Sequence, residues 1–280
     1  MKDIEGFHTL WTAPYFEKSK DDTYSMQDYE LLTMILSALM WRKMNGPITL
    51  YGDARAIDYV EGQGLSHIWN GGIKEIQVPD SISPGVFWAA GKLYALKAAH
   101  MPAVMDLDLI VWKNIGEYIA GTDICAIHRE GIYPDVYPGR DFFNMDSSYS
   151  FDPLWSWDVP PVNTCMLYMA KEQFKNYYVD SSIQFMENCR ETEENLCHMV
   201  FAEQRLLAMC AARKGKIIAS FFPEAADIER QDVFTHLWGY KNILKFNYGK
   251  RVEFNGRLCE RIEREFPEEA DVIRELHVCR

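Results

Sequence analysis

The sequence of 280 residues has few positive charges: 29 Lys and Arg stand against 41 Asp and Glu, which gives a net charge of −12. Such an acidic chain has no basic field to attract phosphate, so non-specific binding of nucleic acid is excluded. An anionic substrate would need a metal ion or a few well-placed Lys and Arg residues beside it.

The sequence also lacks long apolar runs. The longest, LLTMILSALMW at 31–41, is interrupted by Thr33 and Ser37 and is too short to cross a bilayer, so it reads as a buried helix. The amino terminus, MKDIEGFHTLW, has no apolar segment of signal-peptide length. The seven cysteines contain no C-x-x-C pair, which favours reduced thiols over a zinc site or a disulfide framework. We therefore expect a cytoplasmic protein with no transmembrane segment, which still allows peripheral association with a membrane.

Strand and helix patterns alternate along the first hundred residues and less regularly afterwards. We expect strands at 6–11, 48–52, 73–78, 102–106, 124–128, 163–169, 216–222 and 233–238. We expect helices at 25–44, 56–63, 86–99, 170–187 and 193–213 and in a tail from Val252. This alternation predicts an α/β fold whose mostly parallel, mixed central sheet is flanked by helices. With no internal repeat or low-complexity linker, residues 1–280 are expected to form a single domain.

The stretch AVMDLDLIVW at 103–112 places Asp106 and Asp108 in an otherwise apolar run. Residues i and i+2 of a strand point to the same side, so both carboxylates should face one spot. Like charges this close repel unless a cation separates them, and oxygen ligands suit Mg²⁺ or Mn²⁺. The carboxyl ends of strands are also where open α/β sheets bind ligands. The stretch therefore predicts a divalent metal site.

A segment of 34 residues at 129–162 has no clear helix or strand pattern but is rich in aromatic side chains. They are Tyr133, Tyr137, Phe142, Phe143, Tyr149, Phe151, Trp155 and Trp157. Loops of this length are uncommon in compact domains unless they serve as lids or binding loops. Two interpretations stay open: aromatics that pack on the core, or a lid or acceptor platform that stacks on sugar rings.

Several segments together resemble a known family. The D-x-D stretch resembles the metal-binding segment of GT-A-fold glycosyltransferases that use nucleotide sugars. Three more segments agree with this family in order and spacing: FWAAGKLYALK at 87–97, NTCMLYM at 163–169 and AEQRLL at 202–207. A further segment, THLWGYK at 235–241, resembles the H-x-x-G-x-x-K segment of retaining members. Two positions depart from the family pattern, because Cys165 replaces a frequent Gly and Lys241 comes one position early.

The resemblance implies roles for particular residues. The implied metal ligands are Asp106, Asp108 and His236. The implied donor-binding residues are Thr9, Trp11, Lys92, Asp106, Asn163, Gly239 and Lys241. The implied catalytic residues, near the anomeric carbon, are Glu203 and Gln204. Purely structural interpretations stay open: a core histidine for His236, an exposed helix charge for Lys92, a strand cap for Asn163 and a helix-start carboxylate for Glu203.

The resemblance also implies a function: metal-dependent transfer of a sugar, with retention, from a nucleotide diphosphate donor to a saccharide or other glycan-precursor acceptor, as in polysaccharide biosynthesis. UDP-sugars are the expected donors, and Mn²⁺ is favoured somewhat over Mg²⁺ because the ligand set includes an imidazole. Residues 1–112 would form the nucleotide-sugar-binding half, and 113–280 would complete the metal site and hold the acceptor. Glu203 would act either as a nucleophile or as a stabiliser of an oxocarbenium-like ion while the diphosphate guides the acceptor.

Two other functions share features with this sequence. A catalytically inactive nucleotide-sugar-binding protein would keep this fold without turnover. A phosphohydrolase of the haloacid dehalogenase type also has D-x-D after an apolar strand, but that motif normally opens the first strand and continues with a small residue. Here about a hundred residues precede it and Leu109-Ile110 follow.

Overall fold

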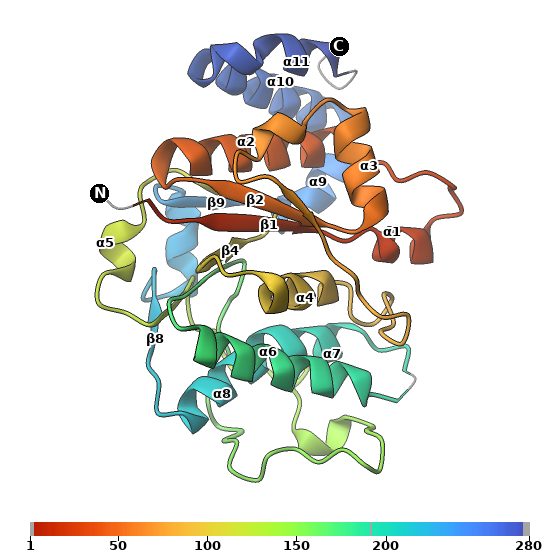
Figure 1. The fold of residues 1–280 in the computed structure, drawn as a ribbon, viewed down its shortest axis with the longest axis vertical. Helices are drawn as coiled ribbons and strands as arrows, with labels where there is room; N and C mark the ends of the chain where they lie inside the picture. The colour runs from red at the N-terminus through yellow and green to blue at the C-terminus, as the bar shows by residue number, and fades with distance from the viewer. Residues whose placement is uncertain (1–2, 191, 277–280) are drawn as a thin grey trace.

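The computed structural model describes residues 3–190 and 192–276 and is built around one seven-stranded sheet (Figure 1). The strand order is β3 (Ile73–Glu75), β2 (Ile48–Gly52), β1 (Gly6–Leu10), β4 (Ala103–Met105), β7 (Met166–Met169), β6 (Ile124–Ala126) and β8 (Ile218–Ser220). Only β7 runs antiparallel to its neighbours among these strands. The predicted α/β class with a mostly parallel, mixed sheet is confirmed, and strands from both predicted halves share the sheet.

Helices cover both faces of the sheet (Figure 1). On one side lie α2 (Asp28–Met44) and α3 (Ala54–Gly62), with α10 (Tyr248–Glu265) and α11 (Ala270–Glu275) outside α2. On the other lie α4 (Ala90–Ala98), α6 (Glu172–Glu187), α7 (Leu196–Val200) and α8 (Leu206–Arg213). Every residue of α2 from 31 to 41 is buried, which is typical of a helix that is apolar all round and packed on two sides.

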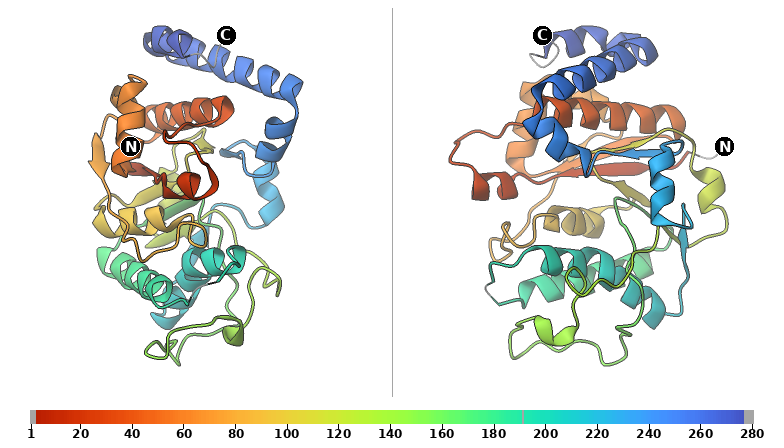
Figure 2. Two further views of the ribbon diagram at one scale, coloured as in Figure 1. Left: turned by 90° about the vertical axis from the view of Figure 1, so that its right-hand side faces the viewer. Right: turned by 180° about the vertical axis from the view of Figure 1, so that it is seen from behind.

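A second, two-stranded sheet lies beside the first. It pairs β5 (Leu109–Val111) antiparallel with β9 (Phe234–His236), and Leu109 is opposite His236. From behind, Figure 2 shows β9 leading directly into α9 (Tyr240–Phe246) and then into α10. This pairing places a residue from the last fifth of the chain next to the D-x-D stretch.

The remaining elements are short. They are α1 (Ala13–Lys18), α5 (Gly116–Ile119), 3₁₀ turns at Ser66–Ile68, Arg140–Phe142, Ala225–Arg230 and Pro267–Glu269, and a π-helical turn at Phe201–Arg205. The predicted helix at 193–213 is therefore divided by the π-helical turn. The helical tail begins at Tyr240 instead of Val252, and α10 starts afresh after Asn247, whose side chain caps it.

The aromatic loop at 129–162 is largely packed against the protein. Tyr137, Phe143, Phe151 and Trp155 are buried, and the rings of Phe143 and Phe201 lie 4.5 Å apart. Packing on the core is thus observed for these four rings. Exposed side chains in the loop include Tyr133 and Phe142.

Two further expectations concern membranes and thiols. Within 3–190 and 192–276, no helix combines the length and apolar character needed to span a membrane. Five cysteines are free thiols: Cys125, Cys165, Cys189, Cys197 and Cys210. Cys259 is disulfide-bonded, so the expectation of reduced thiols is wrong for this residue, and Cys279 lies outside the described residues.

Candidate functional site

A cavity of about 300 Å³ opens at the carboxyl ends of β1 and β4. Parallel strands end at the same edge of a sheet, so side chains that follow β1 and β4 meet there. The cavity is lined by Thr9, Leu10, Trp11, Trp88, Ala89, Gly91, Lys92, Met105, Asp106, Leu107, Asp108, Glu203 and Lys241. It therefore gathers residues from both halves of the chain.

Asp106 and Asp108 lie in a turn, not in a strand. β4 ends at Met105 and β5 begins at Leu109, and the turn is closed by a 3.1 Å hydrogen bond from the Leu109 N–H to the Asp106 carbonyl. The expectation that strand geometry points both carboxylates the same way is wrong. The Asp106 N–H also donates to the Cys165 carbonyl (2.8 Å), which fixes the turn against the chain just before β7.

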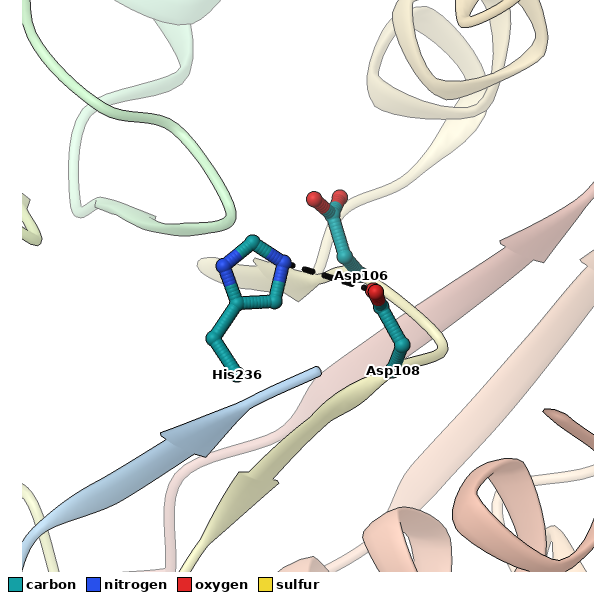
Figure 3. A group of neighbouring side chains, drawn as sticks. All are labelled: Asp106, Asp108 and His236. Carbon is teal, nitrogen blue, oxygen red and sulfur yellow. Dashed lines mark ion pairs between the residues drawn. The ribbon is translucent and has the colours of Figure 1, made fainter. Parts of the chain in front are cut away.

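The two aspartates nevertheless converge with His236 (Figure 3). One potential ligand atom from each of the three residues lies within 4.8 Å of the other two. The β5–β9 pairing brings His236 opposite Leu109, so its ring reaches Asp108 from the second sheet. Two carboxylate oxygens and one imidazole nitrogen at this spacing fit a divalent cation such as Mn²⁺ or Mg²⁺.

Asp108 is buried between two cations. Its Oδ1 lies 3.4 Å from His236 Nε2 and its Oδ2 2.8 Å from Lys241 Nζ. Burial alone would raise the pKa of Asp108, but His236 and Lys241 outweigh it and lower that pKa. Burial likewise opposes the charge on His236, yet Cys165 and Asp108 raise its pKa to about 11. Without a metal ion, the imidazolium and Lys241 therefore balance the Asp108 charge.

Lys92 forms the second charged contact of the site. Its ammonium group donates to Asp106 Oδ1 (2.7 Å), Glu203 Oε1 (2.6 Å) and the Thr164 carbonyl (2.7 Å). Burial favours the neutral amine, but the two carboxylates raise the pKa of Lys92 above its ordinary value. Burial also raises the pKa of Asp106, against the pull of Lys92. An ammonium group has three donors, and all three are engaged here.

Glu203 is held on the π-helical turn Phe201–Arg205. Its side chain accepts a 2.9 Å hydrogen bond from the Thr164 hydroxyl as well as the contact from Lys92, and its carbonyl accepts one from the Tyr178 hydroxyl (2.6 Å). π-helical turns are often found at functional sites because the extra residue shifts side chains around the helix. Gln204 does not line the cavity; its Oε1 accepts a 2.5 Å hydrogen bond from the Tyr137 hydroxyl.

Only some of the predicted donor-binding residues line the cavity. Thr9 and Trp11 line the cavity, and the buried Thr9 hydroxyl has no hydrogen-bond partner among the described residues. Asn163 is turned to local contacts, since its side chain accepts from the Cys165 N–H (3.1 Å) and donates to Glu130 (3.3 Å). Gly239 precedes α9, and an added Cβ there would meet no described atom within 4 Å.

Sequence reasoning missed two supporting residues. Thr164 lies inside the segment NTCMLYM at 163–169, but only the structure reveals its contacts with Lys92 and Glu203. Gly91 precedes Lys92, and a Cβ at this glycine would lie 2.5 Å from the Cβ of Trp11. The absence of a side chain at Gly91 therefore lets α4 lie close to Trp11. In the sequence, the only indication of this role is a small residue next to Lys92.

A second cavity of about 550 Å³ shares Trp11 with the first. Its lining residues are Trp11, Asp53, Ala54, Glu75, Ile76, Gln77, Val78, Pro79 and Asp80. Asp53 accepts hydrogen bonds from the Thr12 N–H (2.8 Å) and the Ala56 N–H (2.9 Å), which ties the start of α3 to the end of β1. The two cavities thus share Trp11 in their linings.

No protein-family model and no curated protein sequence matches this chain. Several solved structures are similar in fold. They include a 4-diphosphocytidyl-2C-methyl-D-erythritol synthase from Anaerococcus prevotii (11% identity, 81% of this chain and 89% of that one, TM-score 0.37). They also include the bifunctional glycosyltransferase WbbM (9%, 78% and 38%, TM-score 0.42) and the PaToxG glycosyltransferase (10%, 91% and 78%, TM-score 0.41). Identities of 9–11% and TM-scores no higher than 0.42 establish neither a shared activity nor a shared substrate.

Proposed function

We propose that the chain is a metal-dependent glycosyltransferase of the GT-A type that moves a sugar from a nucleotide diphosphate donor to a saccharide or other glycan-precursor acceptor. The observation that carries the proposal is the convergence of Asp106, Asp108 and His236, since both aspartates line one cavity together with Lys92 and Lys241. An acidic protein can bind a diphosphate only where a metal ion and local cations offset its charge. The sequence resemblance supplies the identity of the donor class.

Asp106, Asp108 and His236 would hold the metal ion. When bound, the ion supplies Lewis acidity that stabilises negative charge on a departing diphosphate. Because metal ligation needs a neutral imidazole, His236 must release its proton when the ion binds. With Asp108 engaged as a metal ligand, Lys241 would be released from its contact with that carboxylate, so Lys241 is the cation that we assign to the donor phosphates.

Lys92 has a different part in this proposal. All three of its donors are engaged by Asp106, Glu203 and the Thr164 carbonyl, so it has none left for a phosphate. We propose that Lys92 positions the two carboxylates instead of contacting the donor directly. Asn163 and Gly239 remain predicted donor contacts, although neither lines the cavity.

Glu203 is proposed as the group nearest the reacting sugar, because it lines the cavity and is held by Lys92 and Thr164. In a double displacement its carboxylate would attack the anomeric carbon as the diphosphate leaves, and the acceptor hydroxyl would then displace it, giving its proton to the diphosphate. In the alternative route Glu203 would stabilise an oxocarbenium-like ion while the leaving diphosphate guides the acceptor hydroxyl to the same face and takes its proton. Both routes retain configuration, as the sequence resemblance favours. Gln204 is assigned a supporting role through Tyr137.

Thr9 and Trp11 are proposed to contact the nucleoside part of the donor. The unpartnered Thr9 hydroxyl supports a polar ligand at this place, since buried polar groups are rarely left without partners. Trp11 lines both cavities, and the second is large enough for a nucleoside beside a diphosphate in the first. UDP-sugars are proposed as donors on the strength of the sequence resemblance.

The test is a calorimetric titration of UDP-, GDP-, CMP- and TDP-sugars with and without Mn²⁺. Wild type is compared with Asp108→Asn and with Asp123→Asn, a control whose carboxylate pairs with Lys216 at the surface. We expect one donor to bind only with Mn²⁺, and this binding to be lost in Asp108→Asn but kept in the control. Failure of every donor to bind would reject the proposal.

Turnover of the bound donor completes the test. Metal-dependent release of the nucleotide from that donor, in the presence or absence of a saccharide acceptor, is expected for a transferase. Binding without any turnover would identify an inactive nucleotide-sugar-binding protein. Hydrolysis of simple phosphate esters without preference for a sugar nucleotide would identify a phosphohydrolase.

A further inference from the structure

One segment of the chain exposes an unusual number of large apolar side chains. Five of the twelve such side chains in the described residues fall within 238–252: Trp238 (78% exposed), Ile243 (41%), Phe246 (81%), Tyr248 (80%) and Val252 (51%). They belong to α9, the start of α10 and the residue before the turn into α9. We call this set the α9–α10 surface. Exposed apolar groups gathered in one place mark an interaction site, whereas single ones need no explanation.

The same segment is basic although the protein is acidic. Residues 233–252 contain Lys241, Lys245, Lys250 and Arg251 and no Asp or Glu. Arg251 pairs with Asp28 (2.6 Å) and Lys241 with Asp108, whereas Lys245 and Lys250 are exposed and form no ion pair with any described residue. The local charge of the surface is therefore positive and partly uncompensated.

The geometry points to an anionic membrane surface as the partner of the α9–α10 surface. Trp, Tyr and Phe side chains beside lysines are the combination that settles at the boundary between headgroups and acyl chains. In α9 the buried Leu244 faces the protein while Ile243 and Phe246, three residues apart, face outward. The segment is too short to span a bilayer, so it would lie in the interface plane.

The charge of the α9–α10 surface favours an anionic membrane over a second copy of the chain. Two copies of the chain facing each other through this surface would bring the same lysines together, which opposes self-association through it. Anionic lipid headgroups complement both the lysines and the amphipathic aromatics. In the left view of Figure 2, α9 and the start of α10 lie at the outer edge of the molecule, where a flat surface can reach them.

The position of this surface has a consequence that rests on the proposed function. α9 begins four residues after His236, and Lys241 on α9 contacts Asp108 in the cavity. A membrane held by the α9–α10 surface would thus adjoin the site. An acceptor anchored in that membrane, a glycan precursor carried on a lipid, is the class of acceptor that this arrangement would present.

The test is co-sedimentation of the metal-free chain, without donor, with vesicles of phosphatidylcholine alone or mixed with phosphatidylglycerol. We expect binding to the mixed vesicles at low salt and little binding to phosphatidylcholine. Each basic residue near an anionic surface contributes about fivefold to the binding constant, so Lys245→Gln/Lys250→Gln should weaken binding about 25-fold. The matched control, Lys171→Gln/Lys214→Gln, changes two exposed lysines at the α6–α8 end of the molecule and should leave binding unchanged.

The aromatic contribution is tested by Phe246→Ser/Tyr248→Ser, against Leu154→Ser/Ile217→Ser as a control at exposed apolar positions elsewhere. Only the first pair should abolish sedimentation, with circular dichroism showing that both variants are folded. Absence of wild-type binding to mixed vesicles, or equal loss in variants and controls, would overturn the inference. So would concentration-dependent dimerisation that Phe246→Ser/Tyr248→Ser removes. Because neither donor nor metal is present, failure here is distinct from failure of the proposed function.

Discussion

Replacing Lys92 by methionine tests whether the charges of the site are balanced within the protein. The substitution keeps most of the side-chain volume but leaves the carboxylates of Asp106 and Glu203 without their shared cation. Removing one partner of a buried ion pair costs about 3–5 kcal/mol. The lower end, about 3 kcal/mol, applies here because the Asp106 side chain is 35% exposed and water screens part of its charge.

The loss should depend on pH in a defined direction. The folded-state pKa of Lys92 lies above its unfolded value, so the contribution of the lysine is fully present at about pH 8 and is lost only at higher pH. Removing Lys92 raises the pKa of Asp106 further above its unfolded value. The folded variant then takes up a proton more readily than the unfolded chain, so the loss should shrink as pH falls toward about 5.

Urea unfolding of Lys92→Met at these two pH values measures both effects. Lys97→Met is the matched control, because Lys97 lies on the same helix and its 3.1 Å pair with Asp180 is exposed on both sides. This control should lose less than about 1 kcal/mol. The reasoning is refuted if Lys92→Met loses no more than Lys97→Met, or if its loss is the same at both pH values.

Burial lowers the pKa of His8 to about 3, whereas the unfolded chain takes up a proton on this residue below about pH 6.5. The free energy of unfolding should therefore fall by about 2 kcal/mol between about pH 6.5 and pH 5. In urea unfolding His8→Gln should reduce this pH dependence; the same dependence in the variant and wild type would contradict it. Ser37 accepts a hydrogen bond from His8 Nε2 (3.1 Å) and donates one to the Leu109 carbonyl, so Ser37→Ala should cost about 1–2 kcal/mol in the same assay. Thr33→Ala removes a hydroxyl that bonds only within α2 and should lower the free energy of unfolding by less. Equal losses in the two variants would argue against a stabilising link from His8 through Ser37 to Leu109. Glu203→Gln should keep calorimetric donor binding within about threefold and lower turnover at least about 100-fold; undiminished turnover would remove Glu203 from the reaction.

Much of the candidate site could be predicted because it follows from local patterns. An apolar run that ends at Asp106 and Asp108 indicates the end of a strand, and this prediction does not depend on the rest of the sequence. The reason given for their convergence was nevertheless wrong: the carboxylates meet through a turn between β4 and β5, not through the alternation of one strand. Apolar runs on both sides of the two aspartates cannot distinguish one long strand from two short ones.

The charge network of the site could not be predicted from the sequence. Lys92 and Glu203 are 111 positions apart, and nothing local indicates that the same ammonium group also reaches Asp106. The roles assigned to Gln204 and Asn163 depend on the direction of each side chain. That direction is set by the π-helical turn for Gln204 and by the Cys165 and Glu130 contacts for Asn163. The helix patterns of the second half predict the helices themselves but not the directions of these side chains.

The pairing of β5 with β9 fixes the order in which the site can be built during synthesis. A growing chain contains both aspartates by residue 108, but the imidazole that completes the ligand set arrives only at residue 236 and the lysine beside it at 241. Until β9 docks, the carboxylates have no partner from the second sheet. A chain that ends before residue 234 would contain every strand of the large sheet but neither His236 nor Lys241, so it would lack two of the groups that we propose for the metal ion and the donor.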